Sequence, residues 1–262
     1  MKRVVFNQKG GVGKSTIAVN LAAIAASRGR RTLLIDLDTQ GNSSRYLLGD
    51  AAMDIKPTTA DFFEHSLSFR LSSMSIGEYV HPTPFENLML MPASPGLADL
   101  QSKLESRSKI LKLRKALEEL EGFDEMIIDT PPALNFYTRS ALIAADACLI
   151  PFDCDDFSRQ ALYGLLEAVE EIRDDHNEGL RVEGIVVNQY QARAAQPQRI
   201  VQELIDEKLP VLASRLSSSV KVRESHDAAS PLISLAPSHK LTLEFIALYE
   251  ELERRRKGAR KR

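Results

Sequence analysis

Ten residues near the start of the chain combine small side chains with positive charge. The stretch "NQKGGVGKST", residues 7–16, holds three glycines and two lysines between a strand-like run and a helical pattern. Backbone N–H groups of such a loop can surround phosphate oxygens, and the N-terminus of the following helix attracts negative charge. Lys14 would then neutralise the β- and γ-phosphates, and the Ser15 hydroxyl would bind Mg²⁺. The spacing predicts a phosphate loop, with Gln8 at the position where a glycine usually begins the pattern.

Acidic side chains follow two further strand-like runs. Asp36 ends "LLID" and Asp38 comes two residues later, while Asp129 lies in "IIDTPP", residues 127–132. Because ligands bind at the carboxyl ends of the strands in open α/β sheets, we expect the three carboxylates beside the phosphate loop. The pattern leaves their individual roles interchangeable. Asn188 ends another run, where its amide would pair with the edge of adenine or simply form a turn.

The elements that must position these groups alternate along the chain. Expected strands are 3–7, 31–36, 87–93, 125–132, 147–152 and 180–189, and expected helices are 15–29, 109–120, 158–175, 197–209 and 240–256. Strands of continuous apolar sequence between helices predict an α/β fold. We expect a single doubly wound, mainly parallel sheet with helices on both faces, in one domain over residues 1–262. Residues 50–86 are the least regular, and short helices and loops are expected there.

Composition favours a soluble protein with a sizeable core. The 262 residues are 44% hydrophobic and 27% charged, no apolar run is long enough to span a membrane, and no signal peptide is expected. Two cysteines, Cys148 and Cys154, match no metal spacing, so a reduced, cytoplasmic setting is expected. The net charge of −2 conceals a basic tail, because residues 254–262 hold seven basic side chains and the remainder has 27 basic and 36 acidic residues. Such a tail contacts a polyanion or is a solvated helix end.

The phosphate loop also resembles that of a known family. "KGGVGKS" is similar to the deviant phosphate loop of the ParA/MinD ATPases, and "NQKGG" is typical of their ParA branch. The resemblance covers residues 1–48 strongly, 123–190 well and 220–235 weakly, whereas 50–110 match little. It implies that two chains pair face to face around two ATP molecules, with Lys9 of each chain contacting the phosphates bound by the other. Without the resemblance, Lys9 is simply a lysine that points to solvent.

The family pattern implies a role for each remaining group. Asp38 would place the attacking water, Asp36 would lie near the metal, and Asp129 would hold Mg²⁺ through a water. The implied catalytic residues are Lys9, Lys14 and Asp38, and the implied metal site comprises Ser15, Asp36 and Asp129. The implied ATP-binding residues are Lys9, Gly10, Gly11, Val12, Gly13, Lys14, Ser15, Thr16 and Asn188. ATP and Mg²⁺ are the expected cofactors.

Members of the ParA branch bind DNA without sequence preference, and two segments here suit that role. "SSSVKVRESHDAASPL", residues 217–232, resembles a ParA segment, with Lys221 where an arginine implicated in DNA contact usually lies. The predicted DNA-binding residues are Lys221, Arg223, Arg254, Arg255 and Arg256, with Arg193, Arg199 and Arg215 as further candidates. For each, a solvated surface position is the alternative. The implied partners are a second copy of the chain, non-specific DNA at the nucleoid, and a ParB-like or other cargo-bound adaptor.

These features predict an ATP-dependent dimerising ATPase that partitions or positions a plasmid, a chromosome or a protein assembly, with weak hydrolysis stimulated by the adaptor. Two alternatives stay open: a MinD-like membrane-associated switch and a metabolic ATP-dependent enzyme of the same fold. MinD-like relatives end in an amphipathic membrane helix, and here the apolar stripe comprises Leu243, Phe245, Ile246, Leu248, Tyr249 and Leu252. Glutamates interrupt the stripe and suit an anionic lipid surface poorly. We therefore expect the stripe to pack on the sheet, without stable membrane association.

Overall fold

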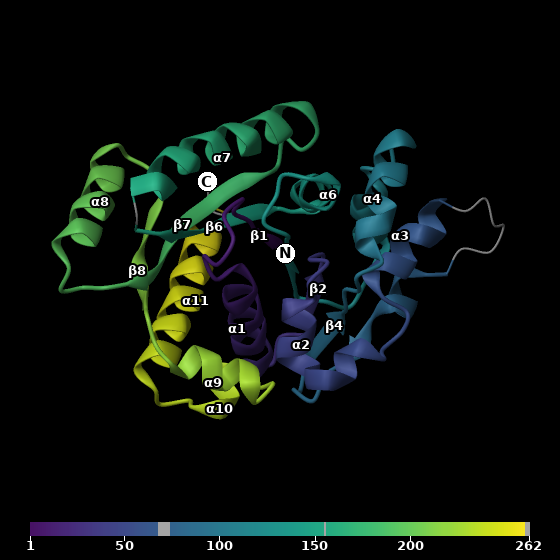
Figure 1. Ribbon diagram of the computed structural model, residues 1–262, viewed down its shortest axis with the longest axis horizontal. Helices are drawn as coiled ribbons and strands as arrows, with labels where there is room; N and C mark the ends of the chain where they lie inside the picture. Colours follow the sequence, from purple (N-terminus) through teal and green to yellow (C-terminus); the bar gives the residue numbers. More distant parts are fainter. Residues whose placement is uncertain (68–73, 155, 260–262) are drawn as a thin grey trace.

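The computed structural model describes residues 1–67, 74–154 and 156–259. One eight-stranded sheet forms its centre, in the order β3-β4-β2-β5-β1-β6-β7-β8, with helices on both faces (Figure 1). β3 pairs antiparallel with β4, and the other neighbouring pairs are parallel. The strands are β1 (Lys2–Val5), β2 (Thr32–Asp36), β3 (His81–Pro82), β4 (Leu88–Met91), β5 (Glu125–Asp129), β6 (Ala147–Asp153), β7 (Arg181–Tyr190) and β8 (Val211–Ser217). The predicted α/β fold with a mainly parallel sheet is confirmed.

Two apolar cores lie on the two faces of this sheet. On one face, α1, α2, α10 and α11 contribute buried side chains, and on the other α3 to α8 do so (Figure 1). The helices are α1 (Lys14–Ser27), α2 (Asn42–Leu48), α3 (Thr59–Leu67), α4 (Leu97–Ser106), α5 (Lys112–Glu119), α6 (Phe136–Ala144), α7 (Asp156–Asp175), α8 (Ala195–Asp206), α9 (Lys221–Asp227), α10 (Leu232–Leu235) and α11 (Lys240–Ala259). Two 3₁₀ turns, η1 (Gly49–Met53) and η2 (Ile76–Tyr79), complete the described elements. The described parts of the irregular region, residues 50–67 and 74–86, contain short helices, as expected, and residues 68–73 lie outside the described ranges.

The last helix packs its apolar stripe against the protein, with one correction. Phe245, Leu248 and Leu252 are buried against α1 and the sheet, as predicted. Leu243 does not share their face, because its side chain is 54% exposed, and Leu241 is buried instead. The predicted strand 125–132 is also shorter than expected. It ends at Asp129, since the two prolines at 131 and 132 have no N–H to donate to a sheet.

A buried ion cluster ties distant strands together at the amino ends of β1 and β5. The Arg3 guanidinium is fully buried, and its Nε and Nη2 donate to the two carboxylate oxygens of Glu183 at 2.6 and 3.1 Å. Its Nη1 donates to Glu125 Oε1 at 2.6 Å, and the Tyr249 hydroxyl donates to Glu125 Oε2 at 3.0 Å. A buried charge requires such paired partners, because leaving one uncompensated costs several kcal/mol. The cluster therefore fixes β1, β5, β7 and α11 relative to one another.

Candidate nucleotide-binding site

The loop between β1 and α1 has the backbone that a phosphate loop needs. Gly11 and Gly13 have φ angles of 77° and 87°, a left-handed conformation that strains any residue with a Cβ atom. Asn7 holds the start of the loop, because its Nδ2 donates to Pro151 O at 2.7 Å and its Oδ1 accepts from the Lys9 N–H at 2.9 Å. The loop is thus fixed to the carboxyl end of β6, at the edge where parallel strands place ligands.

The N-terminus of α1 is free to receive an anion. No side chain caps it, so its first N–H groups have no partner within the helix. A Cβ atom built on Gly10 or Gly11 would meet no atom within 4 Å, which means that open space adjoins the loop. By contrast, Asn135 Oδ1 already accepts from the N–H groups of Tyr137 and Thr138 at the start of α6. Open space beside uncapped N–H groups fits a bound phosphate at α1.

Lys14 brings positive charge into this space. Its side chain is buried, and its Nζ donates to the Lys9 carbonyl oxygen at 2.9 Å, across the loop. Burial lowers the pKa of Lys14, while the carboxylates of Asp129 and Asp38 oppose that shift. A bound polyphosphate would supply closer counter-charge and would favour the ammonium form.

Two aspartates meet on adjacent strands beside the loop. Asp36 at the end of β2 lies in register with Asp129 at the end of β5, and both are fully buried. Burial raises the pKa of Asp36, and the charge of Asp129 adds to the rise. Burial likewise raises the pKa of Asp129, against the opposing influence of the Ser15 and Ser43 hydroxyls. Two buried carboxylates side by side are a place where an added cation is electrostatically favourable.

The two aspartates differ in their hydrogen bonds. Asp36 Oδ2 accepts from the Ser44 N–H at 2.8 Å and the Ser44 hydroxyl at 2.7 Å, and its Oδ1 accepts from the Asp38 N–H at 3.0 Å. Asp129 Oδ2 accepts from the Ser43 hydroxyl at 2.7 Å, but its buried Oδ1 has no hydrogen-bond partner among the described residues. An orphaned buried carboxylate oxygen near a serine hydroxyl is a donor set that fits Mg²⁺ or one of its waters.

Asp38 lies in a tight turn at the rim of the same space. Its side chain is 5% exposed, its Oδ1 accepts from the Gln40 N–H at 3.0 Å, and its carbonyl accepts from the Gly41 N–H at 2.9 Å. The Asp36 carboxylate therefore stabilises this turn. It accepts from the Asp38 N–H within the turn and from Ser44 at the start of the helix that follows it. Sequence reasoning missed Ser43 and Ser44, although their position just after the "DLDTQGN" segment, at the start of α2, is a signal that they could contact its carboxylates.

The other predicted groups lie around the mouth of the loop. Lys9 Nζ is 3.5 Å from Asp153 Oδ2, with both side chains about one third exposed. Asn188 Nδ2 donates to the Val12 carbonyl at 2.9 Å, and a Cβ on Gly13 would come within 2.3 Å of that Nδ2. Asn188 thus holds the phosphate loop against β7, in addition to its predicted contact with adenine. Gln189, which the sequence reasoning left out, donates from Nε2 to the Gly11 carbonyl at 3.0 Å.

The predicted DNA-binding residues fall in two separate places. Lys221 and Arg223 lie on α9, where Lys221 pairs with Glu224 and Arg223 is exposed. Arg254, Arg255 and Arg256 lie near the end of α11, at the opposite end of that helix from α9 (Figure 1). Among the further candidates, Arg193 is exposed, Arg199 is 3.7 Å from Glu203, and Arg215 is half-buried. α9 therefore lies beside the start of α1, whereas Arg256 shares its partner Glu253 with Arg30, just after the end of α1.

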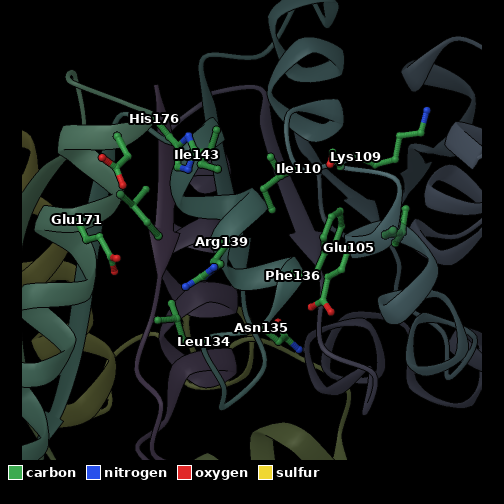
Figure 2. Close-up of a pocket in the computed structure, with 14 residues that line it drawn as sticks. Glu105, Lys109, Ile110, Leu134, Asn135, Phe136, Arg139, Ile143, Glu171 and His176 are labelled. Carbon is green, nitrogen blue, oxygen red and sulfur yellow. The ribbon is translucent and has the colours of Figure 1, made fainter.

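A groove elsewhere on the protein does not share the features of this site. It has a volume of about 400 Å³ and lies between the end of α4, α6 and α7. Figure 2 shows Glu105 and Glu171 on its walls, with Arg139 between them. Its lining mixes acidic side chains with Lys109 and Arg139, and the nearby N-terminus of α6 is capped by Asn135. Among the described residues, this groove therefore lacks the uncapped helix N-terminus that adjoins the loop at α1.

Comparison with known proteins agrees with this geometry. A family model described as "AAA domain" matches residues 2–182. The chromosome partitioning protein ParA of Myxococcus xanthus is 34% identical over 256 residues, which cover 96% of this chain and 87% of that protein. The chain belongs to the ParA/MinD family of P-loop ATPases. The resemblance of its phosphate loop to this family is therefore confirmed.

Solved structures place this ParA/MinD-family chain among nucleotide-binding folds. Cobyrinic acid a,c-diamide synthase from Mycobacterium smegmatis with bound ADP and magnesium is 27% identical, with a TM-score of 0.75 over 87% of this chain and 91% of that one. The McdA(D38A)–ATP complex of Cyanothece has a TM-score of 0.83 and 23% identity, over 97% of this chain and 96% of that one. The second likeness shows that the two proteins share a fold.

Proposed function

We propose that the protein is an ATPase that dimerises with bound ATP and Mg²⁺, binds DNA without sequence preference and positions a cargo along it. The observation that carries the proposal is the phosphate loop with two lysines, Lys9 at its mouth and Lys14 buried inside, beside the orphaned oxygen of Asp129. ATP and Mg²⁺ are the cofactors that the sequence implied, and a solved relative holds ADP and magnesium. Membership of the ParA/MinD family supports the partitioning or positioning role.

Each group of the site has a separate role in the transfer of the γ-phosphoryl group to water. The uncapped N–H groups of α1 and the Lys14 ammonium bind the phosphates, and Ser15 with Asp129 would hold Mg²⁺. When bound, Mg²⁺ neutralises charge on the β- and γ-phosphate oxygens. Asp38 orients the attacking water, and Asp36 keeps the Asp38 turn in place through its hydrogen bonds. Lys9 acts on the nucleotide of a second copy, as a point charge that complements the transition state.

The proposed partners follow from the charge and the packing of the helices. A second copy of the chain completes each site with its Lys9, non-specific DNA contacts the basic residues of α9, and a ParB-like or other cargo-bound adaptor stimulates hydrolysis. The proposed location is the cytoplasm, at the nucleoid. Within the described ranges, no helix combines the length and apolarity that a membrane span requires. Most of the apolar stripe of α11 is buried, with Leu243 the exposed exception, which disfavours the MinD-like alternative.

Replacing the water-orienting group should separate ATP binding from hydrolysis. Asp38→Ala leaves Lys14 and the N–H groups of α1 in place, so we expect unchanged ATP affinity. Loss of a positioned carboxylate should lower turnover by about 10²-fold or more, and the variant should accumulate as a DNA-bound dimer. ATPase rates and DNA co-sedimentation measure both effects, with the exposed Asp50→Ala as a control. Wild-type turnover in the Asp38 variant would remove this residue from the mechanism.

Charge reversal on α9 should weaken binding to every DNA sequence equally. Each phosphate contact contributes a slope of about −0.9 to the dependence of log affinity on log salt. The double variant Lys221→Glu/Arg223→Glu should therefore bind unrelated duplexes more weakly at equal salt, with a slope smaller by roughly two. Its ATP affinity should not change. The matched variant Arg254→Glu/Arg255→Glu tests the tail separately, and a result in which neither variant alters DNA binding would exclude both surfaces.

The same assay tests the proposed function as a whole. Wild-type protein with ATP should bind DNA at low salt and should not bind anionic vesicles. Vesicle binding without DNA binding would favour the membrane-associated alternative. Binding to neither, together with ATP hydrolysis, would favour a metabolic enzyme of the same fold.

A further inference from the structure

A histidine on α9 reaches the phosphate-loop helix. His226 Nε2 lies 3.1 Å from the hydroxyl of Thr16, the second residue after Lys14. The His226 ring stacks on Tyr46 of α2, with ring centroids 3.8 Å apart and an interplanar angle of 27°. This contact joins three parts of the chain that the proposed function uses: the phosphate loop, the helix after the Asp38 turn, and the helix that carries Lys221 and Arg223.

Further hydrogen bonds fix the same junction. Asn20 Nδ2 on α1 donates to the Tyr46 hydroxyl at 3.1 Å, and that hydroxyl also hydrogen-bonds with Ser225, which is fully buried on α9. Asn20 Oδ1 accepts from the Leu232 N–H at 2.9 Å, at the start of α10. These groups hold α9 and α10 against α1 and α2. A change in the hydrogen bonding of the Thr16 hydroxyl therefore acts on α9, which is a packed helix and not a loose loop.

We propose that His226 is a positioning residue that couples phosphate bound at Thr16 to the orientation of α9 and thus to DNA binding. The inference rests on the proposed function and adds its regulation. Thr16 lies in the first turn of α1, two residues after Lys14, so its own N–H is among the uncapped groups that would bind phosphate. A hydroxyl has one hydrogen to donate, whereas phosphate oxygens are strong acceptors. When phosphate takes that hydrogen, the Thr16 oxygen is left to accept from His226.

The consequence for His226 is a defined tautomer. Burial lowers the pKa of His226, so the ring is neutral near pH 7 and carries one N–H. Without nucleotide, the Thr16 hydroxyl can donate to an unprotonated Nε2, which places the ring proton on Nδ1. With phosphate bound, the proton must lie on Nε2, giving a chain from His226 through Thr16 to phosphate. Hydrogen bonds in such a chain strengthen one another, and α9 is held more firmly on α1.

Firmer attachment of α9 lowers the cost of ordering its basic side chains on DNA. Lys221 lies at the start of this helix and Arg223 two residues later, so both move with its backbone. DNA binding and ATP binding would then favour each other by the same factor, as linkage requires. For a coupling of ordinary size this factor is roughly 5- to 150-fold.

The tautomer is measured by ¹⁵N NMR on protein labelled at histidine. The chain has five histidines, and the His226 signals are assigned as those that disappear in His226→Gln. Saturation with Mg²⁺ and a non-hydrolysable ATP analogue should shift His226 toward the Nε2–H form. An unchanged His226 tautomer at saturation would overturn the proposal, and this readout does not depend on DNA or on catalysis.

Two variants test the coupling itself. His226→Phe keeps an aromatic ring against Tyr46 but has no N–H, whereas His226→Gln keeps a donor within reach of Thr16. The ratio of ATP affinities with and without DNA should fall at least fivefold toward unity in His226→Phe and should be largely retained in His226→Gln. His176→Phe, at an exposed position after α7, is the matched control and should behave as wild type.

The outcomes distinguish this inference from the proposed function. If wild-type protein lacks ATP-dependent DNA binding, the proposed function fails, whatever the tautomer does. If wild-type protein has such binding and His226→Phe retains the full coupling ratio with a normal melting temperature, the role of His226 is wrong. A His226→Phe chain with a lowered melting temperature is judged by His226→Gln, which must then retain the ratio for the proposal to stand.

Discussion

A Lys14→Ala chain is expected to lose ATP binding while it keeps its fold. Each charge-assisted hydrogen bond from a lysine to phosphate contributes roughly 1.5–3 kcal/mol, or about 10- to 150-fold in affinity. Lys14 is buried beside the phosphate loop, and in the proposed site it contacts both the β- and the γ-phosphate, so two such contacts would be lost together. The free energy of unfolding should not fall, because the substitution removes a buried cation that burial already disfavours.

Thermal unfolding with and without ATP measures both halves of this prediction. Wild-type protein should be stabilised by Mg²⁺-ATP, whereas Lys14→Ala should melt at the same temperature with or without it. The exposed Lys56→Ala is the matched control and should respond to ATP as wild type does. Unchanged ATP affinity in Lys14→Ala would mean that the glycine loop is not the phosphate site.

A Lys9→Ala chain should fail at a later step. The N–H groups of α1 and Lys14 remain, so one chain should still bind nucleotide. The contact that is lost is the proposed one across the dimer, worth roughly 1.5–3 kcal/mol for each of two lysines in a symmetric pair. ATP-dependent dimerisation should therefore weaken by about two to four orders of magnitude, and hydrolysis should fall with it. Analytical ultracentrifugation with a non-hydrolysable ATP analogue measures the dimer.

Mixing two inactive chains tests whether Lys9 acts in the neighbouring site. In a heterodimer of Lys9→Ala with Asp38→Ala, the site in the Lys9→Ala chain keeps its own Asp38 and receives an intact Lys9 from the other chain. That site should hydrolyse ATP, so the mixture should exceed either chain alone. Heterodimers that form and remain inactive would contradict the proposed action of Lys9 in the neighbouring site.

The sequence was most informative where the residues that the chemistry requires also mark a local backbone feature, such as a glycine turn or the end of a strand. Gly11 and Gly13 have the left-handed φ angles that a curled phosphate loop requires, and Asp36 and Asp129 end adjacent strands as the continuous apolar runs implied. Such positions are local, because a glycine, a strand end and a helix start lie within a few residues of one another. The family and the fold could therefore be predicted together, and the nucleotide site stays a prediction.

Elements that depend on tertiary contacts were missed. α6 was not predicted because nearly all of its side chains are buried, so its sequence lacks the one-sided apolar spacing that marks a surface helix. β8 was missed because it is an edge strand in which Ser214 and Arg215 interrupt the apolar residues between Leu212 and Leu216. The link from Thr16 to His226 joins residues 210 positions apart, and no local pattern indicates such a pair.

The buried Arg3 cluster has a consequence for how the chain acquires its structure during synthesis. β1 is made first, yet in the finished sheet it lies between β5 and β6. Of the two carboxylates that pair with Arg3, Glu125 is 122 residues further along the chain and Glu183 is 180 residues further. Until Glu183 leaves the ribosome, the Arg3 guanidinium has Glu125 but lacks the carboxylate that accepts from its Nε and Nη2, and burial of this incompletely paired cation is unfavourable. We therefore expect nascent chains that end before β7 to remain open and sensitive to protease, with protection gained in one late step. Chaperones would therefore bind this protein as a nearly complete chain that is still unfolded. The first strand can be buried in the sheet only after the segment that contains Glu183 has been synthesised.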